Sequence, residues 1–288
     1  MTYSILISII VPAVVLTAST VSTAKIENCS NFGVIKGKEF VGGVVGDIGN
    51  YADVSNVSND GTIEGESYVA GIAGGLGMHT TMSKAFNKGN ISGNSYTAGI
   101  AGFAGYSHGS ANSKYGTLDR SINYGKIEGT AYTAGVLGAA ACYNVLSVGN
   151  EGDIVGTNNV GGVSGHNKYV KTQALYNSGD IFGTSRVGGV IGYNQEGVTS
   201  SAYSTGKVDG DSLVGLMIGY NYNTTMADYY YLERGDQEPF GKNDGGGVAT
   251  PKTEKEMKSD EFAELLGEDF VYDSGLNDGY PVLEWEEE

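Results

Sequence analysis

Short runs of alternating apolar and polar residues recur along this chain with a period of 27 or 28 residues. Each unit reads N-x-G-x-[IV]-x-G, then, after a short gap, [VT]-[GA]-G-[VI]-x-G, and ends in a variable stretch. Six units carry an asparagine at their first position, namely Asn31, Asn59, Asn87, Asn123, Asn150 and Asn177, and Ser204 replaces it in the seventh. One long step marks an insertion around Tyr106–Thr117. Because units this short bury an apolar face only by stacking, the pattern predicts a solenoid of about seven coils.

The two-residue period of a β-strand assigns the faces of each unit. A small or apolar column lies two residues before the asparagines and consists of Cys29, Val57, Ala85, Ser121, Val148, Leu175 and Ala202. An aliphatic column lies four residues after them and consists of Ile35, Ile63, Ile91, Ile127, Ile154, Ile181 and Val208. All three columns share a face, which we expect to point inward. A buried asparagine is costly unless it is paired, and identical amides in a stack pair with one another. We therefore interpret the asparagines as structural.

A second strand is predicted from the apolar column that consists of Val44, Ile72, Ile100, Val136, Val163, Val190 and Met217. A third short strand leads back to the next asparagine. The sequence thus predicts an all-β parallel β-helix of three-strand coils with a roughly triangular cross-section. At the usual spacing of strands, seven coils would be ~34 Å tall.

The regular units span residues 25–232, and a different composition follows. Residues 233–252 are rich in Gly and Asp and are interpreted as a linker. Thr253–Glu256 matches a capping box that opens a helix with Met257, Phe262, Leu265 and Leu266 as its apolar face and Gly267 as its stop. The turn Asn277–Gly279 precedes a strand over Tyr280–Leu283 and then Trp285. We expect residues 253–288 to form a capping module that docks on the last coil.

Residues 1–24 form an apolar leader whose core, Ser4–Ala18, is too short and too interrupted by Pro for a confident membrane span. Two interpretations stay open: a secretion signal peptide, with Ser22 and Ala24 as the small residues before a cleavage site, or an apolar cap on the first coil.

Composition narrows the classes of partner. The chain carries 17 basic and 33 acidic residues, a net charge of −16, which excludes a nucleic-acid groove because phosphate binding needs clustered Lys and Arg. Glycine, at 47 of 288 residues, far exceeds its usual share of about 7% and is expected at fixed turns. Cys29 and Cys142 belong to distant coils, so no disulfide is expected between them.

The strings VGGVVG, VAGIAG, TAGIAG, VGGVSG and VGGVIG resemble the GLUG motif of bacterial surface proteins, and the closing GYPVLEW is similar to the segment that often follows such repeats. The resemblance covers roughly Asn31 to Trp285, with departures at Ser204 and Leu216 in the last unit. It implies a secreted or surface-displayed bacterial protein, often adhesin-like and sometimes joined to a peptidase. The motif defines a scaffold and carries no known catalytic residues.

Candidate chemistry is sparse. His79, His108 and His166 fall in variable stretches of different coils, so no metal site is predicted. Arg120, Arg186 and Arg234 are equally scattered, which disfavours a polysaccharide lyase, and the acidic residues form no dense cluster. Neither a cofactor nor a catalytic residue is predicted, and the Asp-rich turns match no calcium loop.

One aromatic column stands out, nine residues after the asparagine: Phe40, Tyr68, Tyr96 and Tyr132. If its side chains point outward, they form a stripe ~15 Å long on which sugars or proline-rich partners stack. The alternative is that the rings stack on one another and stabilise neighbouring coils. Tyr193 and Tyr220 repeat the arrangement further along.

The function that we expect from the sequence is a non-catalytic extracellular or surface-displayed scaffold that binds host or matrix glycans or proteins through its loops and the aromatic stripe. A carbohydrate-active β-helix enzyme and the repeat region of a larger surface peptidase are the alternatives.

Overall fold

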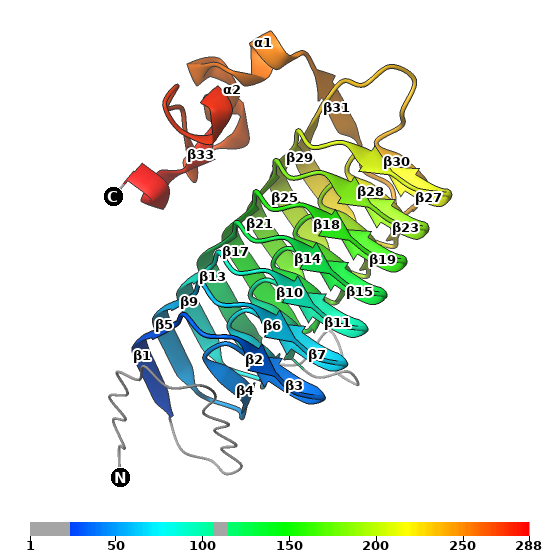
Figure 1. Cartoon of the computed structure of the whole chain (residues 1–288). Coiled ribbons are helices and arrows are strands. Elements are labelled where there is room, and N and C mark those ends of the chain that lie inside the picture. Colours follow the sequence, from blue (N-terminus) through cyan, green and yellow to red (C-terminus); the bar gives the residue numbers. More distant parts are fainter. Residues whose placement is uncertain (1–23, 106–114, 288) are drawn as a thin grey trace.

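A computed structural model describes residues 24–105 and 115–287 of the chain, and these residues form a parallel β-solenoid with a small C-terminal module beside it (Figure 1). Consecutive coils rise along one axis, and each strand pairs in parallel with its counterpart one coil later. The predicted fold class, a parallel β-solenoid of about seven coils with a helix-plus-strand module, is confirmed.

Each coil contributes one strand to each of four parallel sheets, one more than the three strands expected. The first sheet holds the long strands β1 (Lys25–Asn31), β5 (Asp53–Asn59), β9 (Thr81–Asn87), β13 (Gly116–Asn123), β17 (Tyr143–Asn150), β21 (Lys171–Asn177), β25 (Val198–Ser204), β29 (Thr225–Leu232) and β31 (Ala249–Lys252). The second sheet holds β2 (Ile35–Lys36), β6 (Ile63–Glu64), β10 (Ile91–Ser92), β14 (Ile127–Glu128), β18 (Ile154–Val155), β22 (Ile181–Phe182) and β26 (Val208–Asp209). The third sheet holds β3 (Glu39–Gly42), β7 (Ser67–Ala70), β11 (Ser95–Ala98), β15 (Ala131–Ala134), β19 (Asn158–Gly161), β23 (Ser185–Gly188) and β27 (Ser212–Gly215). The fourth sheet holds β4 (Val45–Ile48), β8 (Ala73–Leu76), β12 (Ala101–Gly105), β16 (Leu137–Ala141), β20 (Ser164–Lys168), β24 (Ile191–Gln195), β28 (Ile218–Tyr222) and β30 (Phe240–Asp244).

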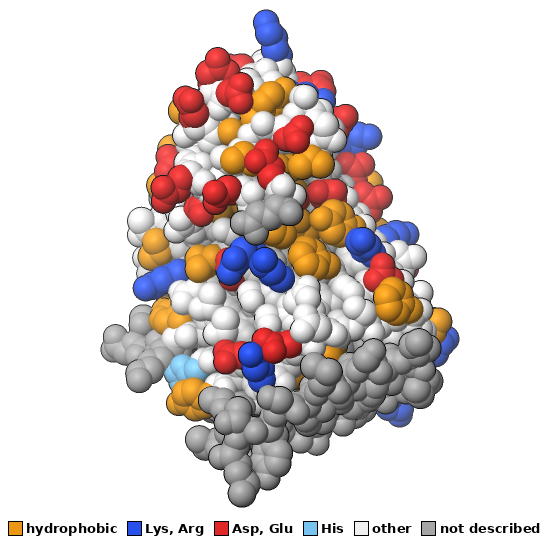
Figure 2. Space-filling model, turned by 90° about the vertical axis from the view of Figure 1, so that its left-hand side faces the viewer, with side chains coloured by type: hydrophobic (Ala, Val, Ile, Leu, Met, Phe, Trp, Pro, Cys, Tyr) orange, Lys and Arg blue, Asp and Glu red, His pale blue; other side chains and the backbone are white. Residues whose placement is uncertain are grey.

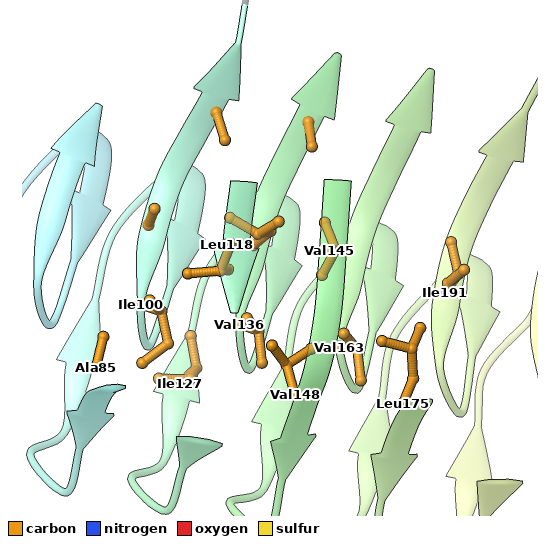
Figure 3. Packing of buried hydrophobic residues seen from close by; sticks show 14 of the residues in the cluster. Ala85, Ile100, Leu118, Ile127, Val136, Val145, Val148, Val163, Leu175 and Ile191 are labelled. Carbon is orange, nitrogen blue, oxygen red and sulfur yellow. The ribbon is translucent and has the colours of Figure 1, made fainter. Parts of the chain in front are cut away.

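The extra strand arises because the predicted second strand bends at its glycines. In the third coil the chain turns at Gly99 and Ile100, between β11 and β12. Ile100 therefore lies at a corner and not within a strand, yet it is fully buried, as expected for its column. Figure 3 shows Ile100, Val136 and Val163 pointing into the solenoid beside residues of the first sheet. The corner explains why the cross-section has four sides.

The register confirms the sequence columns. Asn31 pairs with Asn59, and Asn87 pairs with Asn123 across the long step, so the register of the strands is the same on both sides of that step. The aliphatic column is buried throughout, and Ile35, in the first coil, is 7% exposed. Burial of these side chains supplies the main stabilisation of each coil.

The asparagine column is inside and forms the expected hydrogen bonds. Nδ2 of each asparagine donates to Oδ1 of the next at 2.7–2.8 Å, from Asn31 through to Asn177. The same nitrogen also donates to the glycine carbonyl two residues later, at 2.8–3.0 Å. We call this column the asparagine ladder. Both hydrogens of each amide are therefore used, which offsets the cost of burying it.

The glycines at the corner between the third and fourth sheets lie close to the side chains of the asparagine ladder. A Cβ atom on Gly99 would lie 2.2 Å from Oδ1 of Asn123 and 2.3 Å from the carbonyl oxygen of Gly135. The glycine is therefore needed for close approach across the core. In the seventh coil, Leu216 stands where the earlier coils have the corner glycine. The residue that follows Ser204 in the asparagine column is Tyr231, so no asparagine amide has to approach Leu216.

Residues 233–252 are more than the linker suggested by their composition. β30 pairs with β28 in the fourth sheet, and β31 pairs with β29 in the first. These strands continue the stack past the seventh coil. The linker interpretation failed because short strands rich in Gly and Asp have little intrinsic strand preference, and pairing with the coil below determines their structure.

The C-terminal module lies along the flank of the first sheet, not on the end of the last coil (Figure 1). It comprises α1 (Glu254–Met257), α2 (Asp260–Leu266), the antiparallel pair β32 (Phe270–Val271) and β33 (Val282–Leu283), and the 3-10 helices η1 (Asn277–Gly279) and η2 (Glu284–Glu287). The capping box of Thr253 and Glu256 and the stop at Gly267 are present. The expected single helix is split in two, and Leu265, placed on its apolar face, is 50% exposed.

Outward-facing aromatic residues of the solenoid explain this docking. Tyr176 and Tyr203 stand directly before the asparagine column and point away from the core, yet both are fully buried. Phe262 packs edge-on against Tyr203 at 5.8 Å between ring centroids, and Asn277 donates to the Tyr203 hydroxyl at 2.8 Å. The docked module buries these two rings, which would otherwise face solvent, and this burial stabilises its position on the flank.

The apolar leader interpreted from residues 1–24 lies, except for its last residue, outside the described residues. Within residues 24–105 and 115–287, no helix is long and apolar enough to span a membrane. Cys142 is buried and Cys29 is half-buried, and they are not joined in a disulfide.

Candidate functional site

The four aromatic residues singled out by the sequence do form one feature of the surface. Phe40, Tyr68, Tyr96 and Tyr132 are the second residues of β3, β7, β11 and β15. Each has a left-handed backbone, with φ between 50° and 56°. Their rings stack in sequence at centroid distances of 4.5, 4.6 and 4.6 Å, with planes within 7° of parallel. The sequence thus identified the members of this stack.

The stack of rings continues beyond Tyr132, the last aromatic residue of the column that the sequence identified. After Tyr132 the third-sheet position is taken by Asn159, Arg186 and Leu213, which keep the left-handed backbone. The rings continue on the neighbouring fourth sheet as His166, Tyr193 and Tyr220, with centroid distances of 5.9, 4.9 and 5.0 Å. We call these seven residues, from Phe40 to Tyr220, the ring ladder. It crosses all seven coils over about 30 Å.

The crossing is possible because the two columns are adjacent. The ring of Phe40 lies over Gly75 of β8, where a Cβ atom would be 3.2 Å from the ring. Small residues of the fourth sheet thus leave room for the rings of the third sheet. Phe103 of β12 fits differently and packs edge-on against Tyr68 and Tyr96 at 6.4 and 5.9 Å.

Stacking decides which parts of the rings a ligand can reach. Phe40 is 39% exposed, and the other six members are half-buried. Because the faces of the inner rings cover one another, solvent reaches their edges and hydroxyls. No hydrogen bond among the described residues engages the hydroxyls of Tyr68, Tyr96 or Tyr132. Burial, followed by the neighbouring tyrosines, raises the pKa of Tyr96, so this hydroxyl stays neutral and can both donate and accept.

Charged groups gather at the C-terminal end of the ring ladder. The Arg186 guanidinium lies 5.3 Å from the Tyr193 ring centroid, and Lys242 Nζ lies 4.8 Å from that of Tyr220. The Tyr220 hydroxyl donates to Asp244 at 2.9 Å, and Lys242 forms an ion pair with the same carboxylate at 2.6 Å. Burial lowers the pKa of His166 to about 4, so its ring is neutral near pH 7. The last two rings of the ring ladder, Tyr193 and Tyr220, are therefore each in contact with a cation.

The remaining histidines and arginines do not converge. His79 stacks on Tyr51 at 4.5 Å, away from the ring ladder, and His108 lies outside the described residues. Arg120 pairs with Asp119 at 2.7 Å, and Arg234 donates to the carbonyl oxygen of Thr205 at 2.6 Å. Across residues 24–105 and 115–287, no three His, Cys, Asp or Glu side chains are grouped so that they could hold a metal ion.

A second set of inward asparagines was not predicted. Asn167, Asn194 and Asn221 are buried in β20, β24 and β28, where earlier coils carry Ile48, Leu76, Ala104 and Ala140. Asn221 donates to Asn243 of β30 at 2.9 Å, and Asn194 donates to Asn221 at 3.4 Å. The signal was present in the sequence as a G-x-N triplet that repeats every 27 residues from Gly165. These three asparagines lie in the core, so they offer no side chain that a ligand could reach.

Comparison with known proteins gives the fold. No family model and no curated protein matches the sequence. A solved structure described as a putative immunoglobulin A1 protease from Bacteroides ovatus superposes with a TM-score of 0.51 at 14% sequence identity. The match covers 88% of this chain and 75% of that one. At this identity the likeness concerns architecture alone, and it agrees with the parallel solenoid described above.

Proposed function

We propose that this protein is a non-catalytic repeat scaffold that binds an extended, uncharged polysaccharide along the ring ladder. The observation that carries the proposal is the run of parallel rings, spaced 4.5–4.6 Å apart from Phe40 to Tyr132, in which the three tyrosine hydroxyls have no partner within the described residues. A regular row of neutral donors and acceptors suits a ligand with regularly repeated hydroxyl groups.

The chemistry of the surface narrows the ligand. Because inner ring faces cover one another, a sugar meets hydroxyls and ring edges there, and Phe40, at the end of the row, is the most exposed ring among the described members. The net charge of −16 disfavours acidic polysaccharides. An uncharged chain that runs parallel to the solenoid axis meets the most ring-ladder residues.

The location follows from the same proposal. We propose that the chain is secreted or displayed on a bacterial surface, where polysaccharides are accessible, as the resemblance to the GLUG repeat implies. A scaffold built from stacked coils holds such a surface rigid without a catalytic centre.

A matched set of variants tests this proposal. Substitution of Tyr68, Tyr96 and Tyr132 together by Phe removes three hydroxyls and keeps the stack, since Phe40 already occupies the column. We expect binding to a responsive polysaccharide from an uncharged panel to weaken at least tenfold, because each lost hydrogen bond contributes about 1 kcal/mol. Tyr51→Phe, at an exposed tyrosine outside the ring ladder, is the control and should bind like wild type.

Two results would overturn the proposal. Equal affinity of the triple variant and wild type would remove the role of the hydroxyls. Release of reducing or unsaturated sugars from the same panel would make the protein a carbohydrate-active enzyme instead.

The Bacteroides ovatus protein favours a second candidate function. That protein is described as a putative protease, and it shares the architecture of this chain. We therefore propose, as the second candidate, that this chain is the repeat region of a surface peptidase, with the solenoid as a spacer. Incubation of the chain with immunoglobulin A1, followed by electrophoresis, tests intrinsic proteolysis. A spacer is not itself catalytic, so this candidate predicts no cleavage, and cleavage that survives purification would contradict both the spacer and the non-catalytic scaffold.

A further inference from the structure

A hollow of about 530 Å³ lies where the C-terminal module meets the flank of the solenoid. Figure 2 shows this side of the molecule, with the acidic side chains of the module in the upper part of the view. We call the hollow the flank site. Its walls include Phe86, Tyr124 and Glu151 from the solenoid and Trp285 and Glu286 from η2. It is therefore present only when the module is docked.

Aromatic side chains form one side of the flank site. Phe86 belongs to β9, and Tyr124 follows β13 one coil later. Trp285 is fixed by a hydrogen bond from its Nε1 to the carbonyl oxygen of Ser147, at 3.3 Å. Its ring lies 6.0 Å from that of Phe86, between centroids, and the two planes are tilted by 53°. The rings thus make an angled corner, not a closed stack, and leave ring surface facing the hollow.

Two carboxyl groups also line the flank site, and they share one hydrogen-bond donor. The Tyr176 hydroxyl lies 2.9 Å from Oε1 of Glu151 and 3.2 Å from Oε2 of Glu286. A hydroxyl carries one hydrogen, so it satisfies one carboxylate at a time. Glu286 also accepts from the backbone N–H of Leu283 at 2.9 Å. With both carboxyls ionised, one of them is left without the Tyr176 hydrogen.

The electrostatics agree with this count. Burial, together with the nearby Glu151 charge, raises the pKa of Glu286 to about 7, and burial also raises the pKa of Glu151. The other titratable groups around the hollow are Tyr124, Tyr176 and Lys84 of β9. Among the described residues that line the flank site, Lys84 is the one with a basic side chain. When both carboxyls are ionised they outnumber the single lysine, so the lining is negative and attracts a cation.

We infer that the flank site binds a ligand through an alkylammonium group, with the cation against the Trp285, Phe86 and Tyr124 rings and its N–H groups directed to Glu151 and Glu286. An ammonium supplies a hydrogen-bond donor to the carboxylate that lacks the Tyr176 hydrogen and offsets negative charge, and aromatic faces attract it. A neutral sugar would contact the rings but leave the charge uncompensated. The inference goes beyond the proposed function, because it concerns another face and another ligand class.

Calorimetry on the full chain tests the inference with two matched pairs of probes. Nα-acetyl-lysine methylamide is compared with its norleucine analogue, and glucosamine is compared with glucose. We expect the cationic member of a pair to bind and its neutral partner not to bind. The responsive pair distinguishes a peptide lysine from an amino sugar as the source of the ammonium. Equal signals within both pairs, or none from either cation, would overturn the inference.

Variants connect the binding to named residues. Glu286→Gln keeps an acceptor for the Leu283 N–H and removes the charge, and Trp285→Ala removes the ring. Each is expected to weaken binding of the cation at least tenfold. Glu284→Gln, at an exposed position of the same 3-10 helix, is the control and should bind like wild type. A chain with Glu286→Gln that binds as tightly as the control would contradict the inference.

A pH series gives a readout that a purely structural role would not move. With a Glu286 pKa of about 7, the ionised form rises from about one tenth at pH 6 to about nine tenths at pH 8. The lysine probe should therefore bind up to about tenfold more tightly at pH 8, and Glu286→Gln should lose this dependence. The same dependence in the variant would be evidence against the site. Polysaccharide binding at the ring ladder, measured in parallel, shows which of the two proposals fails.

Discussion

The most quantitative expectation concerns the middle of the asparagine ladder. Asn123 is fully buried and makes three hydrogen bonds: it accepts from Asn87 at 2.7 Å and donates to Asn150 at 2.7 Å and to the Gly125 carbonyl at 2.8 Å. Asn123→Ala removes all three and leaves their partners in a dry core. At about 1 kcal/mol for each bond, with more for partners left unsatisfied, the loss should be about 3–5 kcal/mol.

Asn31→Ala is the matched control, because it removes the same side chain from the end of the same ladder. Asn31 is half-buried and its bonds to Gly33 are exposed, so water replaces part of what is lost. We expect a cost of about 1–2 kcal/mol. Urea unfolding monitored by circular dichroism gives both values. Equal destabilisation by the two substitutions would refute the claim that the ladder is stabilised by desolvated amide pairs.

Two further predictions concern the corner glycine Gly99 and the docking of the C-terminal module. Gly99→Ala should destabilise the solenoid by about 1–3 kcal/mol in urea, because its methyl group would lie 2.2 Å from Asn123 Oδ1; a neutral result would mean that the corner relaxes freely. The raised pKa of Glu286, about 7, means that the docked module binds a proton that the undocked module releases above its ordinary pKa of about 4.5. Docking should therefore become less stable as pH rises from about 4.5 through 7, so the urea concentration at which the fluorescence of Trp285, the single tryptophan, moves to longer wavelength should shift downward; Glu286→Gln should remove this shift. A shift that persists in that variant would contradict the assignment.

The repeating part of the fold was predictable because each coil repeats the same local contacts. The asparagine and aliphatic columns are defined by spacing alone, and parallel pairing puts equivalent residues in register. The corner at Gly99 and Ile100 was missed, because glycine in an apolar run reads equally well as strand or as bend. The number of strands in a coil therefore required coordinates.

The surface features were less accessible from sequence. The ring ladder was identified from Phe40 to Tyr132, but its continuation through His166 depends on two columns being adjacent in space. The docking of the C-terminal module on the flank depends on contacts between Tyr203 and residues far along the chain. Large aromatic residues at outward strand positions, such as Tyr176 and Tyr203, were the signal that something covers them.

The central claim is that the ring ladder is one continuous binding surface about 30 Å long. The most direct measurement is the affinity of wild type for a length series of uncharged oligosaccharides, taken from the polysaccharide that binds best. If the claim holds, affinity rises with each added sugar until the chain spans the ladder and then levels off. Affinity that is already maximal for a disaccharide, or that does not change between wild type and the variant with Phe at positions 68, 96 and 132, would contradict it.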